Sequence, residues 1–559
     1  MKLGPKKPYF GLTGGWLTFW VTVACATDMT LFGYDQGVFG GVVITQDFLD
    51  TLGIADDAKM QSTVTAIYDI GCFFGAIAAF AVGDPLGRKN TILLGTTIMS
   101  IGAILQISAM NVPHMIVGRI VGGIGNGLNT ATAPVWQGET SKASWRGKLI
   151  VIEMILNIAG FSLSNWVTFG FSFLTGGIVW RMPLALQFIF IVILYGTVPW
   201  LPESPRWLIA KGRIDEAELI LADLEQTEVS DPYIITQSKD IQWAVQYERE
   251  HNVRWRDLLR GRTGGQAGTC TIRRLILGMG TQAMQQLAGI NVLSYYFPSV
   301  LINSVGLEEK MARLLAAINS VSYLLFSTIG IPNVERWGRR KMMMYAAVGQ
   351  CFCWLIITVL LRYTEIPDYP NKKKVASASI AFFFLYYVFF GIGWQGVPWL
   401  YPTEINSLSM RAKGAALGTA TNWIFNFMVV EITLPGIESL GWQFYIIWTV
   451  FNGAFVPIVY FFYPETAGRS LEDLDRYFHD QPSLFVNRDK DAISSKRPQK
   501  YIEHEEGEIR RHSSVSPAAM NAAAAKHRQS VLNRESGSTA MGTEYKEDRF
   551  AEREMVEKV

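Results

Sequence analysis

The chain has 559 residues, of which 49% are hydrophobic, 13% aromatic and only 18% charged. A soluble protein of this length usually divides into several domains and has about a quarter of its residues charged. The composition therefore argues against a soluble enzyme. The net charge of +2 comes with no basic stripe and no zinc-like spacing of Cys and His, so neither nucleic-acid binding nor a metal site is expected.

The apolar residues gather in blocks of about twenty, the length that crosses a bilayer as a helix. Because a backbone in lipid must satisfy its own hydrogen bonds, the sequence predicts an all-α membrane protein. The polar segment 1–14 has no cleavage site after a short apolar core, so the first span is interpreted as an uncleaved signal-anchor. The spans are expected at residues 15–43, 62–83, 91–110, 113–136, 148–170, 182–201, 272–302, 312–334, 342–362, 375–400, 412–434 and 442–463.

These twelve spans divide into two groups of six. Residues 15–201 and 272–463 are the predicted halves, and the polar stretch 202–271 between them is expected to form short amphipathic surface helices. Residues 464–559 are charged and rich in Ser and Ala, which predicts a mostly disordered tail. Lys and Arg gather in alternate short loops, so both termini and the central stretch are expected on the cytoplasmic side. The loop 362–374, with three lysines, departs from this pattern.

The sequence repeats itself at an offset of roughly 250–265 residues, as expected for two halves related in parallel. Three short segments recur at matching places, each after a corresponding pair of spans. The paired segments are Asp84-Pro-Leu-Gly-Arg-Lys89 with Glu335-Arg-Trp-Gly-Arg-Arg340, Glu139 through Arg146 with Glu404 through Arg411, and Pro202-Glu-Ser204 with Pro464-Glu-Thr466.

Several motifs resemble those of the sugar porter family of the major facilitator superfamily, over about residues 15–480. They are Leu31-Phe-Gly-Tyr-Asp-Gln-Gly37, Pro202-Glu-Ser-Pro-Arg206, Gln285-Gln286 with Gly289-Ile-Asn291, and Pro464-Glu-Thr-Ala-Gly-Arg-Ser470. Within the family the chain looks closest to the fungal branch typified by the yeast glycerol–proton symporter. The residues behind this are Gly127-Leu-Asn-Thr130, Pro134-Val-Trp-Gln137 and Phe461-Phe-Tyr-Pro464. Relatives in that branch include hexose, pentose and polyol carriers.

The resemblance implies a proton-coupling role for two charged residues inside spans. Asp35 matches an aspartate that proton-coupled sugar porters protonate from outside, and Arg119 matches the arginine that controls it. The alternative is a permanent buried salt bridge that only holds two helices in register. Asp28 lies two turns before Asp35, where the family usually has a small residue. It is interpreted either as a second titrating group or as a residue facing water near the inner cavity.

The resemblance also assigns a set of polar and aromatic residues to a central substrate site. Amides can donate to and accept from sugar hydroxyls, and an aromatic ring can cover the C–H face; polar residues in spans can instead join helices to one another. Met154 replaces a glutamine of hexose porters beside Glu153, and Tyr323 replaces an asparagine, which Asn319 could partly supply. The expected substrate-binding residues are Gln282, Gln285, Gln286, Asn291, Trp399, Asn422 and Asn426.

Charged residues at the cytoplasmic ends of the spans form a third group. In the family they pair when the carrier faces outward and separate when it opens inward, which is a gate only if the contacts differ between states. A role in setting topology alone would leave the recurrence of acids in both halves unexplained. The expected gate residues are Asp84, Arg88, Glu139, Arg146, Glu203, Glu335, Arg339, Arg340, Glu404, Arg411 and Glu465.

The resulting prediction is a carrier that moves a monosaccharide or polyol by alternating access, with protons as the coupling ion and no other cofactor. The alternatives are a facilitator without proton coupling and a nutrient sensor built on a transporter fold. An enzyme is not expected, since no nucleophile–base pair or metal cluster stands out. We expect a monomer in the lipid bilayer, with the plasma membrane as its location.

Overall fold

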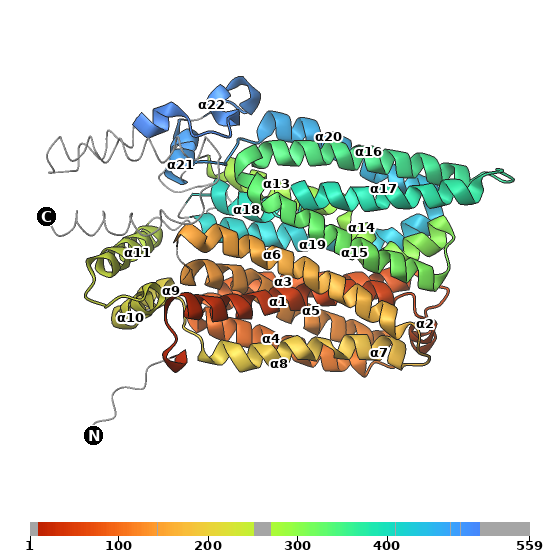
Figure 1. The fold of residues 1–559 in the computed structure, drawn as a ribbon, viewed down its shortest axis with the longest axis horizontal. Coiled ribbons are helices and arrows are strands. Elements are labelled where there is room, and N and C mark those ends of the chain that lie inside the picture. Colours follow the sequence, from red (N-terminus) through yellow and green to blue (C-terminus); the bar gives the residue numbers. More distant parts are fainter. Residues whose placement is uncertain are drawn as a thin grey trace, which may run out of the picture. The chain divides into compact units, whose positions relative to one another are not determined.

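The computed structural model describes residues 9–141, 143–250, 270–407, 410–469, 471–480 and 482–503. Residues 1–496 form one unit, which is the subject of all that follows, and residues 497–559 form a second. Within the described part of the first unit, twelve helical segments run side by side along one direction (Figure 1). This confirms the predicted all-α architecture with its twelve spans.

The first six spans agree with the expected ones to within a few residues. The loop between the first two contains a short helix, and the sixth span is divided into two helices at Leu186. The elements are α1 (Gly14–Val42), α2 (Gln46–Leu52), α3 (Ala58–Leu86), α4 (Arg88–Ile107), α5 (Val112–Thr140), α6 (Ala143–Phe171), α7 (Ile178–Ala185) and α8 (Gln187–Thr197).

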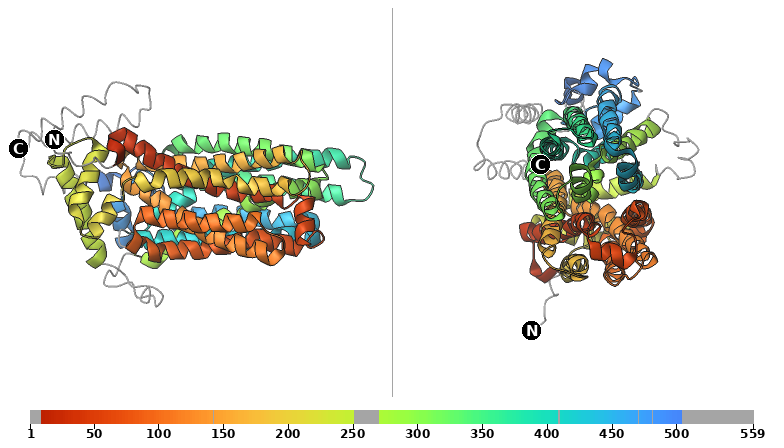
Figure 2. Two further views of the ribbon diagram at one scale, coloured as in Figure 1. Left: turned by 90° about the horizontal axis from the view of Figure 1, so that it is seen from below. Right: turned by 90° about the vertical axis from the view of Figure 1, so that its right-hand side faces the viewer.

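The second six spans contain two interrupted helices, α13–α14 and α17–α18, and a π-helical turn, Leu301–Val305, continues α14. In the figures this half is green to blue and the first half is red to yellow (Figure 2). The helices are α13 (Thr271–Leu287), α14 (Ile290–Val300), α15 (Glu309–Trp337), α16 (Arg339–Glu365), α17 (Lys372–Gly393), α18 (Val397–Ile405), α19 (Arg411–Leu440) and α20 (Phe444–Phe462).

Side-chain donors satisfy the backbone where α13 stops and α14 begins. Gly289 has a φ of +91°, which ends the first helix. The freed carbonyl of Ala288 accepts hydrogen bonds from Trp354, Tyr386 and Asn452 at 2.9–3.0 Å. A broken helix at membrane depth is tolerated where such partners replace water, and breaks of this kind line the binding sites of transporters.

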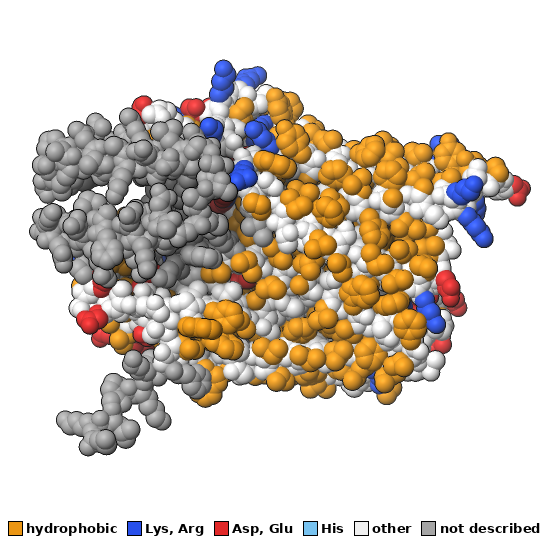
Figure 3. Space-filling view, viewed as in Figure 1, with side chains coloured by type: hydrophobic (Ala, Val, Ile, Leu, Met, Phe, Trp, Pro, Cys, Tyr) orange, Lys and Arg blue, Asp and Glu red, His pale blue; other side chains and the backbone are white. Residues whose placement is uncertain are grey.

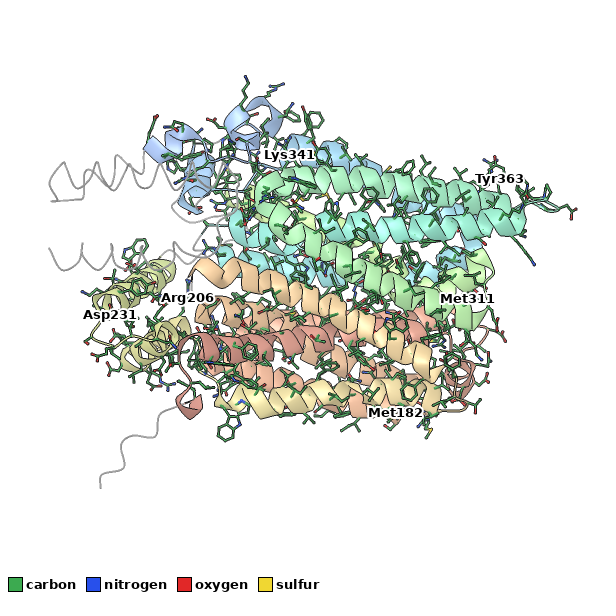
Figure 4. The ribbon with its side chains drawn as sticks, viewed as in Figure 1. Met182, Arg206, Asp231, Met311, Lys341 and Tyr363 are labelled. Atoms are coloured by element: carbon green, nitrogen blue, oxygen red, sulfur yellow. The ribbon has the colours of Figure 1, made fainter. Side chains whose placement is uncertain are left out.

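The two ends of the bundle differ. One carries α2 and is called the α2 end. The other, called the α10 end, carries the helices α9 (Pro205–Ala210), α10 (Ile214–Glu225) and α11 (Pro232–Glu250) that were expected in the stretch between the halves. Figure 4 shows Met182, Met311 and Tyr363 toward the α2 end and Arg206, Asp231 and Lys341 toward the α10 end.

Hydrophobic side chains cover the middle of the bundle in Figure 3, and charged ones gather at its ends. In the described residues, eight stretches are long and apolar enough to cross a membrane, and the last of them contains both α19 and α20. Helices α1, α5 and α13–α14 fall outside these stretches. They carry Asp35, Arg119 and the glutamines of α13, which are among the predicted site residues.

The ordered chain extends beyond the expected start of the tail. Helices α21 (Leu471–His479) and α22 (Lys490–Ile493) follow α20. The Arg273 guanidinium donates to the carbonyls of Pro482, Ser483 and Leu484 at 3.0–3.1 Å, and Arg274 pairs with Asp475. Residues 471–493 are therefore part of the second half, whereas residues 504–559 of the expected tail lie outside the described residues.

Substituting Gly338 with Ala should lower the thermal stability of the protein. Gly338 joins α15 to α16 with φ +84° and ψ 156°, a conformation that costs other residues about 1–3 kcal/mol. A Cβ there would also lie 2.3 Å from Oε2 of Glu465. The measurement is the midpoint of thermal unfolding of the purified protein in detergent.

Gly53→Ala is the matched control, because Gly53 has a φ of +68° but open space around a new Cβ. Its loss of stability should be smaller, since it includes backbone strain and no steric clash. An equal loss in both variants would show that the contact with Glu465 contributes nothing.

Candidate functional site

A partly open cavity lies between the two halves, with about 700 Å³ of empty space when its opening to solvent is included. Six of the seven predicted substrate-binding residues line it, and the seventh, Gln282, lies directly behind Asn422. The lining residues are Met29, Phe32, Gln36, Thr130, Met154, Asn157, Ile158, Phe161, Gln285, Gln286, Ile290, Asn291, Ser294, Tyr323, Phe390, Gln395, Trp399, Asn422, Trp423 and Asn426.

The amides of the second half hold one another in place. Nδ2 of Asn422 donates to Oε1 of Gln282 at 2.7 Å and to Oε1 of Gln285 at 2.9 Å. Gln285 in turn donates to the carbonyls of Trp394 and Gln395, which are freed by the break between α17 and α18. The spacing of the glutamines along α13 therefore does place them on one face, as predicted. The same amides join helices and line the cavity, so the two interpretations are compatible.

Asn291 is the junction between the halves. Its Nδ2 donates to Gln286 and to Asn426, both at 2.6 Å, and its Oδ1 accepts from Gln36 of α1 at 2.9 Å. Asn426 continues the chain of bonds by donating to Oδ1 of Asp69 at 3.1 Å. The predicted amides thus form two groups of hydrogen bonds, and the group around Asn291 reaches into the first half.

Sequence reasoning missed several members of this site. Gln36 follows Asp35 directly, and Asp69 is a carboxylate inside a span with no cation near it in sequence. The sequence therefore contained a signal that each of them contacts other polar residues. Gln395 gave none, because it lies in the break after α17, where it accepts a hydrogen bond from the Tyr323 hydroxyl. Asn319 is buried but does not line the cavity, so it does not take the place that Tyr323 occupies.

Asp35 and Arg119 meet, as predicted, but the pair is loose. Nη1 of Arg119 lies 3.9 Å from Oδ2 of Asp35, and both side chains are buried. Arg119 donates its short hydrogen bonds to the carbonyls of Thr65, at 2.7 Å, and Val64, at 3.3 Å. Its guanidinium also lies over the ring of Phe39, 3.9 Å from the centroid. Arg119 therefore has hydrogen-bond partners other than Asp35.

Asp28 does not face water in this structure. It is 2% exposed and does not line the cavity, so the interpretation as a water-facing residue differs from what is found. Its Oδ1 accepts a hydrogen bond from Asn129 at 2.8 Å. Glu153 is fully buried as well, while its neighbour Met154 lines the cavity.

The charged residues at the α10 end form the same arrangement in each half. In the first half, Arg88 pairs with Glu139 at 2.9 Å, and Glu203 accepts the backbone N–H of Arg88 at 3.0 Å. Asp84 is only 4.0 Å from Arg88 and strongly exposed, which makes that pair weak. Burial raises the pKa of Glu203 above its usual value, although the backbone N–H groups of Ser204, Lys89 and Arg88 oppose this.

In the second half, Arg339 pairs with Glu404 at 2.6 Å and with Glu335 at 2.7 Å. Glu465 accepts the backbone N–H groups of Arg339, at 2.8 Å, and Arg340, at 3.1 Å. Burial tends to raise the pKa of Glu335, but the bond and charge of Arg339 outweigh it and hold that pKa below its usual value. Each cluster thus fastens the start of one helix to the end of another.

Two predicted gate residues remain. The side chain of Arg146 lies outside the described residues, and Arg411 begins α19 at the α10 end. All ion pairs found between the other gate residues join members of the same half. Whether these contacts change between states stays a prediction.

The two halves are joined by hydrogen bonds from the cavity to the α2 end. Besides the network of Asn291, Arg313 donates to Thr45 at 3.0 Å and Thr63 donates to Glu431 at 2.7 Å. A second, smaller cavity lies between α6 and the helices α15 to α18 and is lined by Val334 and Leu400 near the α10 end. The described hydrogen bonds between the halves therefore lie between the cavity and the α2 end.

Comparison with known proteins gives a consistent result. The family model described as "Sugar (and other) transporter" matches residues 20–478. The "MFS-type transporter oryC" of Aspergillus oryzae is 60% identical over 525 residues, which are 93% of this chain and 97% of that protein. The "Sugar transporter STL1" of Saccharomyces cerevisiae is 34% identical over 85% of this chain and 83% of its own length. The structure of the proton:xylose symporter XylE has a TM-score of 0.69 at 23% identity, over 83% of this chain and 99% of that one.

Asn291→Ala should destabilise the protein, because it removes the junction of three amide hydrogen bonds. Bonds between membrane helices contribute about 0.6 kcal/mol each on average, so the expected loss is about 1–2 kcal/mol. The measurement is again thermal unfolding in detergent. Gln350→Ala is the control, since Gln350 is a fully buried amide that accepts and donates no hydrogen bond. A larger loss for Gln350→Ala than for Asn291→Ala would contradict the network.

Proposed function

The chain belongs to the sugar transporter family of the major facilitator superfamily, and on this premise we propose that it carries a neutral monosaccharide or polyol across a membrane together with a proton. The site alternates in access between the two ends of the bundle. We place both termini in the cytoplasm and take the protein to act as a monomer in the plasma membrane. The curated relatives include sugar transporters, among them the low-affinity glucose transporter HXT1 of Saccharomyces cerevisiae, at 29% identity.

The observation that carries the proposal is the chemistry of the cavity wall. Among the described residues, no Asp, Glu, Lys, Arg or His lines the cavity. Its polar groups are side-chain amides and hydroxyls, which can both donate and accept hydrogen bonds. A charged solute would be left without a counter-ion in such a cavity, whereas a solute with several hydroxyl groups finds partners on every polar wall. Trp399, Trp423 and Phe390 add apolar surface for C–H groups.

Proton coupling is supported by the position of Asp35. A carboxylate buried in a membrane protein with one loose ion pair is costly in free energy. A small change of conformation can therefore shift Asp35 from its charged to its protonated form. Arg119 retains its carbonyl partners in either state of Asp35. Protonation from outside would therefore release Asp35 from Arg119 without leaving the guanidinium unpartnered.

Asp35→Asn should abolish proton movement with the substrate, because Asn cannot release a proton. The measurement is external pH in weakly buffered cells that lack their own sugar carriers and express this chain. Glucose, xylose, glycerol and other candidates are added one at a time, with labelled uptake followed in parallel. For the wild type we expect alkalinisation with one substrate.

Asp50→Asn is the matched control, since Asp50 lies on α2, outside both the cavity and the Asp35 pair. It should leave the pH change unaltered. Uptake by the wild type without a pH change would show a facilitator and overturn the proton coupling. Surface expression without uptake of any solute in the panel would overturn carriage of these sugars and polyols.

Gln285→Ala should weaken substrate binding. It removes a lining amide whose hydrogen bonds contribute roughly 0.5–1.5 kcal/mol each, so the apparent Km should rise about 3- to 10-fold. The measurement is the concentration dependence of labelled uptake. Gln350→Ala, the same change in a buried amide away from the cavity, should leave the apparent Km unchanged. Equal values for Gln285→Ala and the wild type would remove Gln285 from the site.

A further inference from the structure

Two carboxyl groups in the core of the first half have no part in the site described above. They are Asp28 of α1 and Glu153 of α6, which are 2% and 0% exposed. Neither lines the cavity, but the residue that follows each of them, Met29 and Met154, does. The two carboxyl groups therefore lie directly behind the cavity wall.

The packing of α1 against α6 sets the two acids at neighbouring levels. Asn157 donates to the carbonyl of Met29 at 3.3 Å, and a Cβ on Gly37 would lie 2.2 Å from the Ser164 hydroxyl. Facing residues of these parallel helices thus differ by about 128 in number, so Glu153 is level with Cys25. Glu153 therefore lies about one helical turn from Asp28, or roughly 5 Å along the helix axis, on the side of the α10 end.

The hydrogen bonds of this pair are incomplete. Asp28 accepts one, from Nδ2 of Asn129, which also donates to Thr96 at 3.2 Å. Oδ2 of Asp28 and both carboxyl oxygens of Glu153 are buried and accept none. A buried carboxylate without partners is costly, and two carboxylates at one site cannot both ionise. The unpartnered Glu153 is the member on which a proton is retained, while the bond from Asn129 favours the charged form of Asp28.

No described cation offsets these charges. Asp28 is the charged group that acts on Glu153, and Cys25 is the other titratable group beside them. On α1 and α5, Asp35 and Arg119 pair with each other nearer the α2 end. Charged groups nearer the α10 end on the surrounding helices are Arg88 and Lys89 of α4, Glu139 of α5 and Glu335 of α15. Arg146 and Lys148 of α6 also lie toward that end, and the side chains of these two lie outside the described residues.

We propose that Asp28 and Glu153 form a second proton-binding site in the first half, which holds one proton on Glu153 beside a charged Asp28. The site lies between Asp35 and the α10 end. A proton released by Asp35 would be taken up by the carboxylate of the pair, and the proton already held would leave toward the cytoplasm. Binding of the proton stands on its own; its use in transport rests on the proposed symport.

The test of proton binding is the infrared spectrum of the purified full-length protein in nanodiscs at neutral pH. A protonated carboxylic acid gives a carbonyl band that shifts in heavy water. We expect Glu153→Gln to lose one such band and Asp28→Asn to keep it at a shifted position, because Glu153 then remains neutral alone. Glu216→Gln, an exposed acid paired with Arg213 on α10, should leave the spectrum unchanged.

An unchanged band in both Glu153→Gln and Asp28→Asn would overturn the site. If Glu153→Gln fails to fold, the expected shift in Asp28→Asn still decides the matter. Thermal unfolding of each variant separates a folding defect from a change in protonation alone.

The relay is tested by comparing substrate exchange with proton-driven accumulation in vesicles. Glu153→Gln should retain exchange within about twofold and lose accumulation by about tenfold or more, which corresponds to at least 1.4 kcal/mol of coupling. If the wild type itself moves no protons, the symport fails while the infrared result stands. If the wild type symports and Glu153→Gln accumulates substrate equally well, the relay is wrong.

Discussion

A polar group inside a membrane protein must find its partner within the protein, and this constraint decides where the polar residues of the chain lie. The carbonyl of Ala288, freed by a helix break, is met by three side-chain donors from α16, α17 and α20. The carbonyls freed after α17 are met by Gln285. The two helix breaks thus expose backbone carbonyls, and buried side chains of neighbouring helices supply their hydrogen-bond donors.

The spans and the shared face of the glutamines could both be predicted from the sequence, because apolar blocks and residue spacing are local signals. Blocks of apolar residues gave the spans to within a few residues, and the spacing of Gln282, Gln285 and Gln286 placed them on one face. The helix breaks left glycine signals that were not used: Gly289 marks the first break, and Gly391 and Gly393 come directly before the second, at Trp394. The segment 471–493 was read as tail because it is charged, although Leu471, Leu474 and Phe478 recur on one helix face.

What the sequence could not supply is which polar residues of the first half meet the second. Asp69 and Gln36 reach the network through Asn426 and Asn291, contacts between residues more than 250 positions apart. The two walls of the cavity also differ. The first half contributes Met29, Phe32 and Met154, whereas the second contributes most of the amides. Only the folded arrangement shows that most of the amides lining the cavity come from one half.

Ion pairs occur within each half, whereas the contacts described between the halves are hydrogen bonds. In the described residues each ion pair between predicted gate residues lies within one half, and the pairs of Arg88 and Arg339 fasten helix ends to each other. The hydrogen bonds that cross between the halves include no ion pair. At about 0.6 kcal/mol each, the six crossing bonds sum to a few kcal/mol, which is the size of a free-energy difference that a ligand can shift. Under the proposed function, halves joined by weak bonds would rock about the cavity, and a substrate that replaced the bond between Asn291 and Gln36 would change which arrangement is favoured.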